Sequence, residues 1–171
     1  WDRATLRADD WFLTGELFSE EERPGFTAFL EKRAGRTAAI FHDAGFIEQY
    51  DHNEAIGARM AKEILPKYGY TDQHVKTIVE LIHVTQIPHK PINKLQEIIC
   101  DADLDYLGRS DFEQIADNLR KELSEMGKIK SRKEWDTIQV NFLKQHQYFT
   151  TTAIESRQKK KQENLQVVQE Y

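Results

Sequence analysis

The 171-residue sequence has few of the features found in extracellular or membrane proteins. It contains one cysteine, Cys100, so no disulfide can form within the chain and a reducing compartment is expected. A single thiol in the apolar segment Ile98-Ile99-Cys100 is typical of a small core residue. No apolar run approaches the roughly 20 residues that cross a bilayer, and the first residues lack the basic-then-apolar layout of a signal peptide. A cytoplasmic protein without membrane contact is therefore expected.

Positive charge is also scarce. The 24 lysines and arginines are outnumbered by 29 aspartates and glutamates, which gives a net charge of -5. Broad nucleic-acid binding usually requires a basic face, so no nucleic-acid partner is expected. The one basic run, Lys159-Lys160-Lys161, lies in a polar segment near the C-terminus and is expected to form a solvated face.

No segment alternates apolar and polar residues with the β-branched content of a strand, so the sequence predicts an all-α protein. Residues 72–84 carry an apolar stripe at helical spacing. The helix before them shows Ile56, Met60 and Ile64 at four-residue spacing and is expected to stop around Pro66. Two prolines break the chain at residues 86–91. Further helices are expected after Leu95, between Ser110 and Gly127, after Ser131, and over about 151–168.

The first 36 residues differ in character from the rest. Ser19-Glu20-Glu21-Glu22 is a capping box that predicts the start of an amphipathic helix. Residues 17–33 weakly resemble the C-terminal tail of crotonase-like proteins, and a fused remnant of an acyl-CoA enzyme is the lowest-ranked interpretation. We therefore expect a helical appendage over residues 1–36, with a junction or gap near 36/37, and a helical domain over 37–171.

Asp103 is the first candidate for chemistry. In the helix expected from Leu95 it projects to the same side as the apolar stripe, whereas Asp101 and Asp105 share a face better placed for solvent. Burying a carboxylate is costly without a compensating partner. A metal ion and a hydrogen bond from a helix terminus or an arginine are equally good partners on this argument alone.

The second candidate is the pair His42-Asp43, which ends the apolar segment 37–41 and precedes Gly45. Adjacent side chains diverge on a regular helix, but they can converge on one ion at a helix C-terminus. Imidazole nitrogen with carboxylate oxygen suits Mn²⁺, Fe²⁺, Zn²⁺ or Co²⁺, and Mg²⁺ if oxygens dominate.

Taken in order, Ala39-Ile40-Phe41-His42-Asp43-Ala44-Gly45-Phe46 and Ile99-Cys100-Asp101-Ala102-Asp103-Leu104-Asp105 resemble the pattern of the HD superfamily of metal-dependent phosphohydrolases. The resemblance covers about residues 37–165, and the string from Asp101 to Arg109 is similar to a particular bacterial branch. It implies an HD-domain-like helical bundle and a hydrolase that cleaves a nucleotide or other small phosphoester.

Carried over to this chain, the resemblance implies that His42, Asp43 and Asp103 bind a divalent metal ion, one of Mn, Fe, Mg, Zn, Co or Ni. Asp43 would also bridge the metal or orient the attacking water, and His52 would be a further ligand or base. The expected phosphate-binding residues are Arg109 and Lys90, and the alternates for the metal site are His83 and Asp101.

The chain departs from the family at one ligand, because no histidine precedes His42. Three ligands plus water could still hold a metal. Alternatively, the chain is an impaired HD domain that senses nucleotides or binds a partner or a second copy as a homodimer. The aromatic C-terminal residues would then pack on that partner: Trp135, Phe142, Tyr148 and Phe149. The histidines expected to be exposed or merely packed are His74, His89 and His146.

Overall fold

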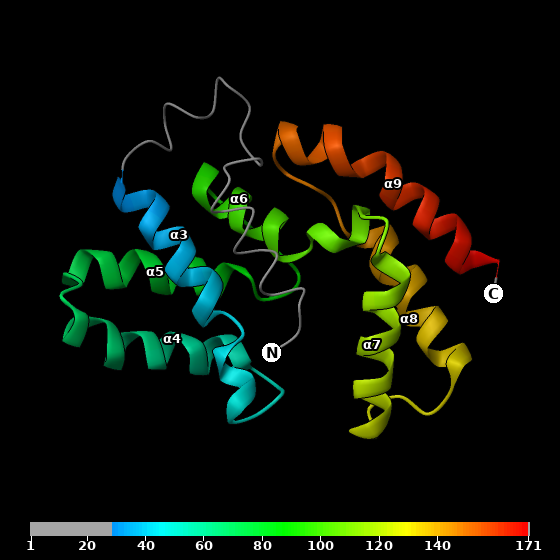
Figure 1. Ribbon diagram of the computed structural model, residues 1–171, viewed down its shortest axis with the longest axis horizontal. Helices are drawn as coiled ribbons and strands as arrows, with labels where there is room; N and C mark the ends of the chain where they lie inside the picture. Colours follow the sequence, from blue (N-terminus) through cyan, green and yellow to red (C-terminus); the bar gives the residue numbers. More distant parts are fainter. Residues whose placement is uncertain (1–28, 171) are drawn as a thin grey trace. The chain divides into compact units, whose positions relative to one another are not determined.

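The computed structural model describes residues 29–170 (Figure 1). Over this range the chain forms seven α-helices and three short 3-10 helices, with no strand, so the all-α prediction is confirmed. Two compact units, residues 1–103 and 104–171, make up the chain. The capping box at Ser19–Glu22 and most of the crotonase-like stretch lie outside the described residues.

The first unit contains four α-helices. They are α3 (Phe29–Phe41), α4 (Asn53–Ile64), α5 (Asp72–Val84) and α6 (Lys94–Asp103), with η1 (Ala44–Ile47) and η2 (Leu65–Tyr68) on either side of α4. Helix α5 packs against the other three (Figure 1). Its buried residues include the predicted stripe, namely Val75, Ile78, Val79 and Ile82. Helix α3 runs through the boundary predicted at residues 36/37, which stays a prediction.

The buried face of α4 is shifted by one residue from the predicted stripe, because it includes Gly57 and Ala61 rather than Ile56 and Met60. Ile64 is exposed, and the buried residues of α4 are Asn53, Gly57, Ala58 and Ala61. A Cβ atom at Gly57 would overlap the backbone carbonyl oxygen of Phe41. The helices therefore approach too closely for large side chains, and small residues fill the interface.

The second unit contains η3 (Asp105–Gly108), α7 (Phe112–Glu125), α8 (Arg132–Gln145) and α9 (Thr151–Gln169). Helix α9 packs against η3 and α8. The aromatic residues Trp135 and Tyr148, expected to be available to a partner, are buried in this unit instead. The core cluster comprises Leu104, Leu107, Phe112, Ala116, Ile129, Trp135, Leu143, Leu165 and Val168.

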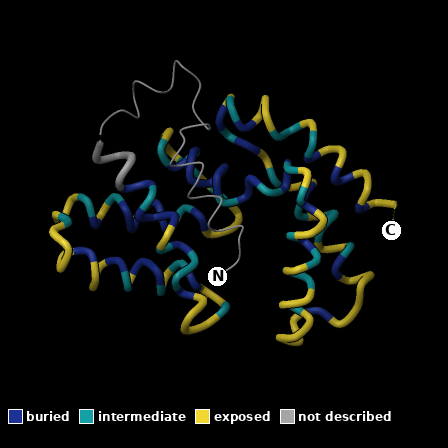
Figure 2. Tube along the Cα trace, in the orientation of Figure 1, coloured by how far each residue is buried: buried dark blue, intermediate teal, exposed yellow. Residues whose placement is uncertain are grey.

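Two predictions about single residues have opposite outcomes. Lys161 is buried rather than solvated, because its Nζ donates to the His146 carbonyl oxygen at 2.6 Å and lies 5.4 Å from the centre of the Tyr148 ring. Cys100 is a buried core residue, as predicted, and burial raises the pKa of its thiol. Figure 2 shows buried and exposed positions alternating along the helices. None of the described helices is long and apolar enough to cross a membrane.

Candidate metal centre

The first turn of α4 holds the backbone of the His42-Asp43 pair. Helix α3 ends at Phe41, and the chain turns directly into η1. The Asn53 side-chain amide donates a 3.0 Å hydrogen bond to the His42 carbonyl oxygen. A Cβ atom at Gly45 would overlap the Asn53 backbone, so only glycine permits this contact. The pair is therefore fixed at both ends of the turn.

His42 directs one ring nitrogen at two carboxylates. Its Nδ1 lies 2.8 Å from the Ala39 carbonyl oxygen, which can only accept a hydrogen bond, so Nδ1 carries a proton. The other nitrogen, Nε2, lies 3.3 Å from Asp43 Oδ2 and 3.2 Å from Asp103 Oδ1. A backbone carbonyl on the far nitrogen is the arrangement that orients metal-binding histidines.

Asp103 lies between two histidines at the end of α6. Its Oδ2 is 3.3 Å from His89 Nε2, and its side chain is 18% exposed. His89 was expected to be exposed or merely packed, and its ring is 5% exposed and directed at Asp103. Loops often carry binding residues, so the two prolines of the 86–91 loop pointed to this segment without indicating the contact itself.

The pair formed by His42 and Asp103 shifts the pKa of both residues. Burial lowers the pKa of His42, but the hydrogen bond and charge of Asp103, with the charge of Asp43, raise it to about 9. Burial raises the pKa of Asp103, but the hydrogen bonds from His42 and His89 lower it well below its usual range. Without metal, the cluster is therefore a protonated imidazole held between ionised carboxylates.

The donor set fits a divalent cation. Among the described residues, no group of three or more His, Cys, Asp or Glu side chains is already arranged so that it could hold a metal ion. Two ligands of a tetrahedral ion at about 2.1 Å lie roughly 3.4 Å apart, close to the distances between His42 Nε2 and the carboxylate oxygens. A cation could replace the Nε2 proton with small movements. One imidazole and two carboxylates suit Mn²⁺, Fe²⁺, Zn²⁺ or Co²⁺ better than Mg²⁺.

Other predicted residues of the first unit lie at its surface. His52 is exposed and precedes α4 with a left-handed backbone (φ 62°). His83, in the last turn of α5, and Lys90, beside His89, are exposed too. Their roles stay predictions. Asp101 is 1% exposed, so its expected solvent-facing position is wrong.

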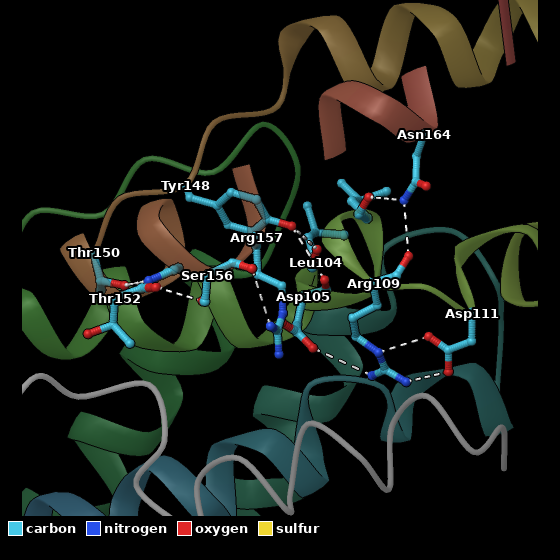
Figure 3. A network of polar contacts seen from close by, with 12 residues as sticks. Leu104, Asp105, Arg109, Asp111, Tyr148, Thr150, Thr152, Ser156, Arg157 and Asn164 are labelled. Carbon is cyan, nitrogen blue, oxygen red and sulfur yellow. Dashed lines mark hydrogen bonds and ion pairs between the residues drawn. The ribbon is translucent and has the colours of Figure 1, made fainter. Parts of the chain in front are cut away.

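Arg109 belongs to a polar network in the second unit (Figure 3). Its guanidinium donates to both carboxylate oxygens of Asp111 at 3.0 and 2.6 Å and lies 3.5 Å from Asp105. Arg157 donates to the other Asp105 oxygen at 2.6 Å. Asp105 is buried rather than solvent-facing, because α6 ends at Asp103 and the helical periodicity does not reach it. Phosphate binding by Arg109 stays a prediction.

Comparison with known proteins identifies no relative of this chain. No protein-family model matches the chain, and neither a curated protein nor a solved structure matches it. The fold therefore defines the class: an all-helical protein with a histidine–carboxylate cluster in its first unit.

Proposed function

We propose that the protein is an HD-type metal-dependent phosphohydrolase acting on a nucleotide or other small phosphoester. One observation carries this proposal. His42 Nε2 lies within 3.3 Å of carboxylate oxygens from Asp43 and Asp103, which come from separate segments of the chain. These are the three metal ligands that the sequence resemblance implies, and their convergence supports it.

In this proposal the residues of the cluster have distinct tasks. His42 binds through Nε2 while the Ala39 carbonyl holds its Nδ1 proton. Asp103 binds through Oδ1, the oxygen that faces His42. Asp43 is the most exposed of the three, at 34%, so it is the residue that orients an incoming water molecule.

When bound, a divalent cation supplies Lewis acidity that polarises a phosphoryl oxygen and activates water near neutral pH. The substrate carries negative charge, and the chain as a whole is acidic. A local positive charge is therefore needed besides the cation. Lys90, exposed next to His89, is the candidate for this role, and His52 is the candidate for a base.

Elemental analysis of the purified protein tests the proposal first. The wild type should contain near-stoichiometric transition metal after reconstitution with Mn²⁺. The His42→Ala/Asp43→Ala double variant should contain none, and His74→Ala should match the wild type because His74 is not expected to belong to the site. A screen of phosphoesters then identifies the substrate. Wild type without metal after reconstitution would contradict the proposal.

A non-catalytic HD module is the second candidate. The observation that favours it is that both oxygens of Asp103 already face histidine nitrogens, so this carboxylate has partners without a cation. Such a module would bind nucleotides or a partner without turnover. Nucleotide binding by a wild type that takes up no metal would favour it.

A further inference from the structure

His89 faces two acceptors with the same ring nitrogen. Its Nε2 lies 3.0 Å from the carbonyl oxygen of Thr85, the residue that ends α5, and 3.3 Å from Asp103 Oδ2. A carbonyl oxygen can only accept a hydrogen bond, so Nε2 carries a proton. In this orientation Nε2 is a donor and has no lone pair for a cation.

His42 has the opposite arrangement. There the backbone carbonyl takes Nδ1 and leaves Nε2 directed at the carboxylates. The two histidines also divide Asp103 between them, because His42 faces Oδ1 and His89 faces Oδ2. The geometry therefore separates a histidine that can bind a cation from one that can hold the carboxylate.

We propose that His89 is a positioning residue that holds Asp103 Oδ2 by hydrogen bonding, so that Oδ1 stays directed at His42 Nε2 and at the cation bound there. This inference rests on the proposed function. It means that His89 is not a ligand of the cation. Instead, the loop after α5 holds one of the three ligands of the proposed site in place.

Asp103 needs such support because of where it lies. It is the last residue of α6, and the following residue, Leu104, has left helical geometry (φ -107°, ψ 21°). Its side chain also remains 18% exposed. Without a partner on Oδ2 the carboxylate could rotate toward solvent, and its ordering would then oppose metal binding. Loss of a hydrogen bond to a metal ligand typically weakens metal affinity about 10- to 100-fold.

Two substitutions of His89 separate positioning from ligation. His89→Ala removes the donor, whereas His89→Gln supplies an amide N–H in its place but no imidazole nitrogen. His74→Ala is the matched control, because His74 is a half-buried histidine of the same unit to which no site role is assigned. The dissociation constant for Co²⁺, measured by competition with a chelator, and the visible spectrum of bound Co²⁺ are the two measurements. Thermal unfolding of each metal-free variant shows that it folds.

We expect His89→Ala to weaken Co²⁺ binding about 10- to 100-fold and His89→Gln to restore affinity with an unchanged spectrum. His74→Ala should bind like the wild type. Unchanged affinity in His89→Ala overturns the inference alone. So does a His89→Gln variant as weak as His89→Ala with an altered spectrum, since that result makes His89 a ligand. A folded wild type that takes up no Co²⁺ or Mn²⁺ overturns the proposed function as well.

Discussion

Asp103 and Asp105 are two residues apart, yet they belong to different units and have different partners. Asp103 ends α6 in the first unit and pairs with His42 and His89. Asp105 begins η3 in the second unit and pairs with Arg109 and Arg157. Each carboxylate faces two nitrogen-containing side chains. The Asp103 side chain is 18% exposed, whereas the Asp105 side chain is only 5% exposed.

The two sites differ in whether the partners of the carboxylate can lose a proton. An arginine stays charged at every accessible pH and donates from a fixed planar group, so the Asp105 network is permanently occupied. Burial raises the pKa of Asp105 even though both guanidiniums oppose it, so the network compensates burial only in part. A histidine can lose its proton. The Asp103 cluster can therefore exchange a proton for a cation, and the Asp105 network cannot.

Among the variants that test this comparison, Asp103→Ala should have the largest effect, which is a loss of metal affinity. It removes the carboxylate that faces both histidines, so we expect metal affinity to fall more than about 100-fold, beyond the usual loss for a residue that only supports a ligand. Asp105→Ala is the matched variant and should keep wild-type affinity. Chelator competition measures both. Equal metal retention by wild type and Asp103→Ala would remove the central assignment.

Asp105→Ala should instead destabilise the fold. It leaves the guanidiniums of Arg109 and Arg157 without the carboxylate that compensates them, and breaking a largely buried ion pair costs about 3 kcal/mol. Asp103→Ala should cost less in the metal-free state, because His42 can become neutral when its carboxylate partner is removed. Urea unfolding of metal-free protein tests the order, and a greater loss in Asp103→Ala would reverse it.

The stability of the metal-free protein should depend on pH through His42. Its folded pKa, about 9, lies above the ordinary value of 6.5, because Asp103 and Asp43 outweigh burial. Its contribution is therefore fully present below about pH 6.5 and is lost as pH rises through about 9. Unfolding free energies of wild type and His42→Gln should converge over this window. A constant difference between them would contradict the ion pair of His42. The stability that the arginine network contributes should not change over this window.

The sequence predicted those parts of the fold and cluster that follow from local pattern. Large apolar residues in α5 recur at helical spacing, and their burial is as predicted. The stripe of α6 predicted the position of Asp103 only in part, because Asp101, which it placed toward solvent, is the more deeply buried of the two. The convergence of His42 with Asp103 required the family resemblance, because no local pattern joins the end of α3 to the end of α6.

Several of the errors involve contacts between distant segments. The buried Asp105 carboxylate pairs with Arg157, and the buried Lys161 ammonium donates to the carbonyl oxygen of His146. The interface of α4 depends on the close approach of Phe41 to Gly57, which a stripe of large residues does not reveal. His89 lies within the 86–91 loop, and its ring contacts Asp103 at the end of the next helix. Such pairings carry no periodic signal along the chain.

The smallest expected effect distinguishes two buried asparagines with the same task. Asn53 donates to the His42 carbonyl oxygen at 3.0 Å, and Asn164 donates to the carbonyl oxygens of Leu107 and Arg109 at 2.9 and 3.1 Å. Each alanine variant leaves buried carbonyl oxygen without its donor, which costs about 1–2 kcal/mol of stability. Urea unfolding of the metal-free proteins measures this loss.

Only Asn53→Ala should also weaken metal binding, because its partner is the backbone of a ligand. Asn164→Ala should keep wild-type affinity at a similar loss of stability, which controls for general loosening of the fold. A parallel loss of affinity in both variants would mean that metal binding follows overall stability. The first turn of α4 would then not be a specific support for His42. The functions of the histidine cluster and the arginine network would also be less distinct than their contacts indicate.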